Sequence, residues 1–142
     1  MAEETVSCPV KIHMVTEFFQ EEELVLFGRY YEKGGAAYLK YNEMQETGEI
    51  HTVVKVGGEK ALILRSGAVS MRLDLRPGEK RPGSYGSGYG TFPLEVMADD
   101  VAHRRTGYMH GQFSLGYRLF IQERQVGTYK MTIHYEEVQE AK

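Results

Sequence analysis

The sequence has no tryptophan, one cysteine and no long apolar run. Because Cys8 is alone, no internal disulfide can form, which is typical of proteins from a reducing compartment. No stretch approaches the roughly 20 consecutive apolar residues of a membrane-spanning helix, and the opening MAEETVSC carries glutamates where a secretory signal has basic residues and an apolar run. We therefore expect a cytoplasmic protein with no membrane partner.

The chain also lacks an excess of charge of either sign. Its 17 lysines and arginines face 20 aspartates and glutamates, so the formal net charge is −3. Nucleic acids and anionic surfaces attract proteins through a basic excess, so no nucleic-acid partner is expected. At 142 residues the chain has the size of one ordinary domain with one core. We expect residues 1–142 to form a single domain.

Alternation of apolar and polar residues dominates the rest of the sequence. Phe113, Leu115 and Tyr117 alternate with polar or small residues, a period of two that is typical of a half-buried strand. Residues 128–135 repeat the pattern, and the ERQVG segment between the two stretches predicts a hairpin turn. Similar stretches recur towards the N-terminus, with Gly-Gly corners at 34–35 and 57–58. Residues 95–105 fit either a helix or a strand followed by an ADD turn, and we favour the strand.

These stretches add up to eight or nine strands joined by short turns. An open sheet of that length would expose two edges and one apolar face. The sequence therefore predicts an all-β fold, namely a single up-and-down antiparallel β-barrel of about eight to ten strands.

The stretch RPGEKRPGSYGSGYGTF, from Arg76 to Phe92, has four glycines between residues 83 and 90. No helix pattern follows it and it contains no Gly-Lys-Ser or Gly-Lys-Thr, so both common phosphate-binding motifs are excluded. A short arm for single-stranded nucleic acid is disfavoured because Glu79 interrupts its basic residues. We interpret the stretch as a corner containing a glycine-bent strand, with Tyr85 and Tyr89 on one face as a flap over the barrel mouth.

No residue pattern indicates catalysis, a metal site or a cofactor. The five histidines, His13, His51, His103, His110 and His134, lack the spacing that directs two rings at one metal ion. The G-x-S-x-G elbow of serine hydrolases is also missing. We therefore expect no catalytic residue, no metal and no cofactor.

Polar residues in phase with the core are the best candidates for a binding site. If Tyr41 faces the interior, so does Glu43, and a buried carboxylate needs a partner. Arg65, in phase with Ile63, is the first candidate for that partner, and Lys55 and Arg72 are further candidates. The pair is either purely structural or helps to orient a small amphipathic or anionic ligand, with Met71 and Met131 as adaptable walls. The candidate ligand-binding residues are Tyr41, Glu43, Arg65, Tyr85, Tyr89 and Tyr117.

Several segments taken in order resemble a known family. They are YNEM, HTVVKV, LRSG, SMRLDLRPG, SGYGTFPLEVMA, GQFSLGYRLFI and GTYKMTI, and together they are similar to the YwiB-like family of small bacterial proteins of unknown function over nearly the whole chain. The resemblance implies a calycin-like, that is lipocalin-like, β-barrel and a bacterial cytoplasmic origin. It implies no activity, substrate or catalytic residue.

Two functions of different class remain open. The first is a small-ligand-binding calycin-like barrel without catalysis. The alternative is a protein-interaction or scaffold module with a filled barrel, which could form a homodimer through an exposed edge strand near Pro9. Interior volume distinguishes them, because a barrel of eight strands can be filled by side chains or can hold one ligand.

Overall fold

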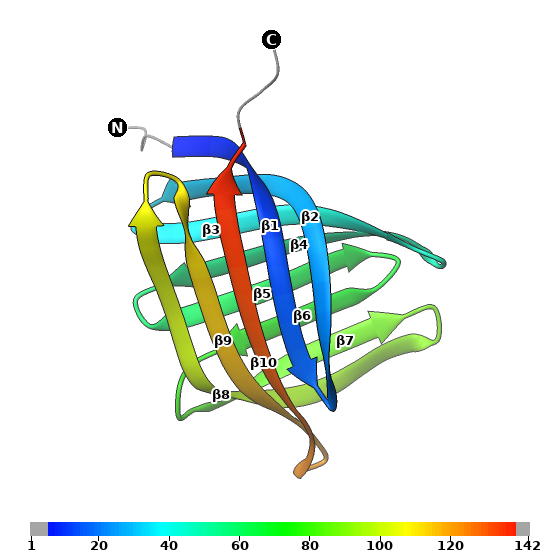
Figure 1. Ribbon diagram of the computed structural model, residues 1–142. Helices are drawn as coiled ribbons and strands as arrows, with labels where there is room; N and C mark the ends of the chain where they lie inside the picture. Colours follow the sequence, from blue (N-terminus) through cyan, green and yellow to red (C-terminus); the bar gives the residue numbers. More distant parts are fainter. Residues whose placement is uncertain (1–5, 139–142) are drawn as a thin grey trace.

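The chain folds into one closed β-barrel (Figure 1). The computed structural model describes residues 6–138, and within this range the chain forms ten strands and no helix. The strands are β1 (Val6–Phe18), β2 (Gln20–Lys33), β3 (Ala36–Gln45), β4 (Gly48–Gly57), β5 (Lys60–Gly67), β6 (Ser70–Leu75), β7 (Lys80–Ser87), β8 (Gly90–Gly107), β9 (His110–Ile121) and β10 (Arg124–Glu137). Each strand pairs antiparallel with the next, and β1 pairs with β10. The predicted all-β, up-and-down barrel is therefore confirmed.

The Gly-rich stretch from Arg76 to Phe92 is two turns and a strand. The first turn is closed by a 3.0 Å hydrogen bond that Glu79 N donates to Arg76 O. Residues 80–87 then form β7, and Gly88 and Tyr89 turn the chain into β8. Residues 95–105 lie within β8, so the strand interpretation is confirmed, but the expected ADD turn is instead an irregularity in the pairing of β8 with β9 between Ala98 and Asp100.

Pairing around the barrel is uneven at β2. This strand pairs with β1 from Gln20 to Glu32, but with β3 only from Gly28 onward. Gly28 marks the point where β2 and β3 meet, and a Cβ atom there would overlap the carbonyl oxygen of Lys40. Glycine is thus required for the close approach of the two strands. Before this point, residues 20–27 of β2 have one partner strand and one unpaired edge.

The first and last strands of the barrel pair with each other, so no unpaired edge remains at Pro9. The β1 strand has β2 on one side and β10 on the other, and Val138 N donates a 3.0 Å hydrogen bond to Pro9 O. The expected exposed edge near Pro9 is therefore wrong. Proline is tolerated there because it lies at the end of the β1–β10 pairing, where its carbonyl still accepts from Val138 and its missing N–H forgoes only one ladder bond.

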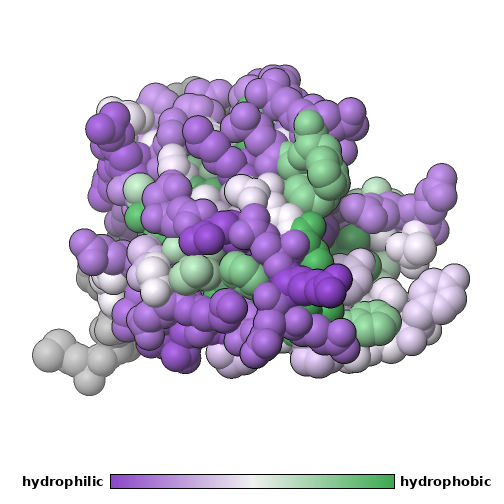
Figure 2. Space-filling view, turned by 90° about the horizontal axis from the view of Figure 1, so that it is seen from below, coloured by the Kyte–Doolittle hydropathy of each residue, from purple (hydrophilic) through white to green (hydrophobic). Residues whose placement is uncertain are grey.

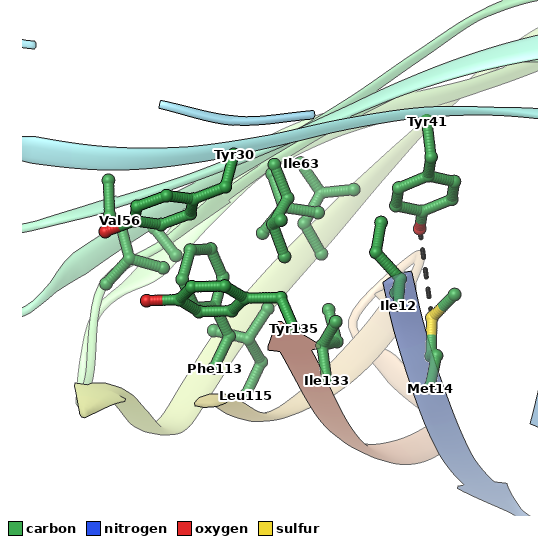
Figure 3. Close-up of a cluster of buried hydrophobic side chains, with 14 of the residues drawn as sticks. Ile12, Met14, Tyr30, Tyr41, Val56, Ile63, Phe113, Leu115, Ile133 and Tyr135 are labelled. Atoms are coloured by element: carbon green, nitrogen blue, oxygen red, sulfur yellow. Dashed lines mark hydrogen bonds between the residues drawn. The ribbon is translucent and has the colours of Figure 1, made fainter. Parts of the chain in front are cut away.

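The core follows the period of two that the sequence predicts. In β9 the side chains of Phe113, Leu115 and Tyr117 are buried, while Ile121 at the end of the strand is 45% exposed. Figure 3 shows the centre of this core, with Ile12, Ile63 and Ile133 between two groups of aromatic side chains. One group holds Tyr30 and Tyr135, and the other holds Tyr41 beside Met14. The barrel therefore has two chemically different ends.

Candidate functional site

A cavity of about 780 Å³ occupies the end of the barrel where β2 and β3 part. We call it the mouth cavity. Its deep walls are buried and consist of apolar or phenolic side chains and one threonine: Met14, Tyr41, Thr52, Ile63, Leu73 and Tyr117. Its rim is exposed and includes Glu22, Leu24, Met44, Tyr85, Phe92 and Val126. In a view from below, apolar side chains interrupt a largely hydrophilic surface (Figure 2).

One row of side chains crosses six strands at the cavity wall. Cross-strand pairing places Tyr41 opposite Thr52, Thr52 opposite Arg65, and Arg65 opposite Met71. The row continues from Met71 to Tyr85 and from Tyr85 to Phe92, and all six residues line the cavity. Directly opposed side chains lie about 5 Å apart at Cβ. The row therefore forms a continuous strip of phenol, hydroxyl, guanidinium, thioether and aromatic groups.

Polar groups of this wall are only partly satisfied. Arg65 Nη2 lies 3.4 Å from Glu43 Oε1, with the two side chains 23% and 14% exposed. Gln45 Nε2 donates to the other carboxylate oxygen of Glu43, also at 3.4 Å. The hydroxyl of Thr52 is buried and has no hydrogen-bond partner within residues 6–138. Buried hydroxyls without partners are rare, and each one calls for a reason.

The two buried phenols of the cavity donate to sulfur. Tyr41 donates to Met14 Sδ at 3.8 Å, drawn dashed in Figure 3, and Tyr117 donates to Met131 Sδ at 3.7 Å. Burial raises the pKa of both phenols well above the ordinary value of 10.0. For Tyr41 the nearby Glu43 carboxylate raises the pKa further, while the Arg65 charge lowers it. Both phenols stay neutral at physiological pH and remain donors.

The structure brings most of the predicted site residues together. Tyr41, Glu43, Arg65, Tyr85 and Tyr117 all line the mouth cavity. Met71 and Met131, expected as adaptable walls, line it too. Tyr89 does not, since it lies at the β7–β8 turn with 97% of its surface exposed.

A cluster at the opposite end was missed by the sequence analysis. We call it the far-end cluster; it comprises Tyr30, Glu32, His103, Arg105 and Tyr135. Tyr30 and Tyr135 stack at 4.2 Å between ring centroids. Tyr30 donates a 2.6 Å hydrogen bond to Glu32, Arg105 lies 3.1 Å from the same carboxylate, and Tyr135 is 2.7 Å from His103 Nε2. Its one readable signal is the i, i+2 spacing that puts Tyr30 with Glu32, and His103 with Arg105, on shared faces.

The surroundings of the far-end cluster favour a structural role. Burial lowers the pKa of the His103 imidazole, an effect that the Arg105 charge reinforces and the Glu32 charge opposes. A hollow of about 690 Å³ adjoins the cluster, and turn glycines such as Gly34 and Gly57 form much of its wall. The two charged side chains of the far-end cluster, Glu32 and Arg105, are already paired with each other. The mouth cavity is therefore the better candidate site.

The remaining chemical groups outline no further site. His13 and His134 stack on the outer surface with ring centroids 6.3 Å apart. Within residues 6–138, no three histidine, cysteine, aspartate or glutamate side chains gather in a way that would hold a metal ion. In the same part of the chain, no helix is long and apolar enough to cross a membrane.

Comparison with known proteins places the fold and the sequence in one family. The family described as "Domain of unknown function (DUF1934)" matches residues 10–133. The "Uncharacterized beta-barrel protein YwiB" of Bacillus subtilis (strain 168) is 30% identical over 133 residues, which cover 90% of this chain and 93% of the relative. The crystal structure of the Bacillus subtilis ywiB protein matches with a TM-score of 0.79 and 25% identity, over 97% of this chain and 96% of that one. The chain therefore belongs to the DUF1934 family of β-barrel proteins.

Proposed function

We propose that this protein binds a small amphipathic molecule in the mouth cavity and performs no chemistry on it. The observation that carries the proposal is the cavity itself, at about 780 Å³. Binding sites for small organic molecules typically measure about 300–1,000 Å³ and combine apolar walls with a few polar groups. A calycin-like barrel is expected to have a role of this kind. The chain has one cysteine and so forms no internal disulfide, which agrees with a bacterial cytoplasm.

The composition of the walls supports this role. Four methionines, Met14, Met44, Met71 and Met131, line the cavity. Thioether side chains are flexible and polarizable, so they adapt to apolar ligands of different shape. Glu43 and Arg65 add a polar pair on one wall. A ligand with an apolar body and one polar group matches this division.

The test uses N-phenyl-1-naphthylamine, a neutral dye that fluoresces in apolar surroundings. We expect saturable binding to the purified protein. Met71→Trp should abolish or strongly weaken it, because the larger indole would fill the cavity next to Arg65 and Tyr85. Phe27→Trp is the matched control, since Phe27 is 66% exposed and does not line the cavity.

Two results would contradict the proposal. One is the absence of dye binding to the wild-type protein. The other is equal binding by the wild-type protein, Met71→Trp and Phe27→Trp, which would mean that the dye sits on the outer surface. Native mass spectrometry of protein purified from its own host adds a direct check. A bound small molecule would appear as added mass on the folded protein and would be released on denaturation.

A second candidate function is an interaction module that forms a homodimer. It is favoured by the unpaired edge of β2 over residues 20–27 and by the exposed apolar side chains of Leu24, Val25 and Phe27. Unpaired strand edges with apolar side chains are sites of strand addition. Two copies could pair these edges antiparallel.

Sedimentation equilibrium tests the dimer. A dimer should dissociate on Val25→Lys, because a lysine on an edge strand opposes edge-to-edge pairing. A monomeric wild-type protein at high micromolar concentration would exclude this candidate and leave the ligand-binding proposal unaffected.

A further inference from the structure

The head group of the ligand can be specified further if the proposed function holds. Two charged side chains lie deep in the mouth cavity, the carboxylate of Glu43 and the guanidinium of Arg65. They lie 3.4 Å apart and are mostly buried. They neutralise each other. Glu22, the other charged residue of the lining, lies on the exposed rim.

Both members of the pair have hydrogen-bonding capacity left over. A guanidinium has five N–H donors, and Glu43 is the one side-chain or backbone acceptor that Arg65 reaches within residues 6–138. Glu43 accepts two contacts of 3.4 Å, at the long limit for a hydrogen bond. Donors and an acceptor thus stand side by side without a common partner.

We infer that the ligand carries an uncharged head group with an acceptor and a donor next to each other, as in a primary amide. Its carbonyl oxygen accepts from Arg65, and its N–H donates to Glu43. Such a head group uses the spare capacity of both side chains and leaves the ion pair intact.

Charged head groups fit this wall less well. A carboxylate that took Arg65 would leave the Glu43 charge without its partner, and an ammonium that took Glu43 would do the same to Arg65. A mostly buried charge without a partner is strongly disfavoured. An alcohol provides a donor and an acceptor on one atom and cannot reach both sides of the pair at once.

The experiment compares ligands that share one tail. Decanamide, decanoate, decylamine and decanol compete at neutral pH against N-phenyl-1-naphthylamine on the wild-type protein. Decanamide should displace the dye at concentrations at least about tenfold lower than decanoate or decylamine. The ranking of head groups is the readout, because all four ligands bury the same apolar chain.

Variants of the pair should change the ranking in opposite directions. Glu43→Gln leaves Arg65 uncompensated, so decanoate should become the best competitor. Arg65→Gln leaves Glu43 uncompensated, so decylamine should become the best. Glu21→Gln is the matched control, since Glu21 is exposed and does not line the cavity. It removes the same charge as Glu43→Gln and should leave the wild-type ranking unchanged.

The outcomes separate this inference from the proposed function. Dye binding with decanamide no better than the charged ligands overturns the inference and leaves the ligand-binding role standing. The same is true if the dye binds but no ten-carbon ligand displaces it. A shift in ranking by Glu21→Gln equal to that by Glu43→Gln also overturns the inference, because overall charge would then decide. No dye binding by the wild-type protein overturns both.

Discussion

The polar groups at the two ends of the barrel differ in how well their hydrogen bonds are satisfied. In the far-end cluster, the phenols of Tyr30 and Tyr135 make contacts of 2.6 and 2.7 Å with Glu32 and His103. In the mouth cavity, Tyr41 and Tyr117 donate to sulfur atoms at 3.8 and 3.7 Å. Oxygen and nitrogen are strong acceptors, whereas thioether sulfur is a weak one.

The ion pairs differ in the same sense. Arg105 lies 3.1 Å from Glu32, while Arg65 lies 3.4 Å from Glu43. Thr52, at the mouth, has no partner among the described residues. A satisfied polar network contributes to the stability of the fold, whereas unused hydrogen-bonding capacity contributes only when a ligand is bound. Under the ligand-binding proposal, the difference separates the end whose polar groups stabilise the fold from the end whose polar groups are left for a ligand.

The largest expected effect comes from removing one phenol hydroxyl at each end. Tyr135→Phe should lower the free energy of unfolding by about 1–3 kcal/mol, because His103 loses its partner in a partly buried setting. Tyr41→Phe should lower it by less than about 0.5 kcal/mol, because the lost acceptor is a weak thioether. Urea unfolding followed by circular dichroism measures both. Equal losses would mean that the ends do not differ.

Next in size is a gain in stability at the mouth. Thr52→Val keeps the β-branched shape and removes the unpartnered hydroxyl, so it should raise the free energy of unfolding by about 1 kcal/mol. Thr128→Val, at an exposed position of β10, is the control and should change it by less than about 0.5 kcal/mol. A loss of stability in Thr52→Val would show that the hydroxyl is satisfied in solution.

A smaller effect of pH is expected from the far end. Because the native pKa of His103 lies below its ordinary value of 6.5, the unfolded chain takes up a proton there before the native protein does. Stability should therefore fall as pH decreases below about 6.5, and this fall should end once the native imidazole also titrates. Urea unfolding at several pH values of the wild-type protein and of His103→Gln gives the contribution of His103 by difference. An equal pH dependence in both proteins would contradict the prediction.

The smallest effect on stability concerns the rim. Tyr89→Ala should change the free energy of unfolding by less than about 0.5 kcal/mol, because Tyr89 is 97% exposed. If Tyr89 acts as a flap, the dissociation rate of the dye will rise in this variant. Tyr85→Ala is the comparison, since Tyr85 lines the cavity and should weaken equilibrium binding. An unchanged dissociation rate in Tyr89→Ala would exclude the flap.

Alternation was enough to predict the fold and half of the site. A period of two identifies strands and their inward faces, so the sequence alone predicts Tyr41, Glu43 and Arg65 in the interior and makes Arg65 the first candidate partner of Glu43. The pairing that matters here joins neighbouring strands β3, β4 and β5, for which short turns restrict the register.

Longer-range relations could not be predicted in this way. Tyr89 was expected beside Tyr85, but the turn begins right after Ser87 and directs Tyr89 outward. His103 and Tyr135 lie on strands separated by β9, and a shift of one residue in either pairing would move them to opposite faces. The unpartnered Thr52 is likewise visible only once its neighbours have positions.

The pairing of β1 with β10, from Val10 opposite Glu137 to Glu17 opposite Lys130, has a consequence for how the barrel is made. These contacts join the two ends of the chain, so they carry the greatest loop-closure entropy in the molecule and raise its contact order. During synthesis, β1 cannot pair with β10 until β10 has been translated. Strands that pair before then form a sheet with two unpaired edges. Folding of this protein should therefore be slow for its size, and the chain should remain prone to aggregation until β10 pairs with β1.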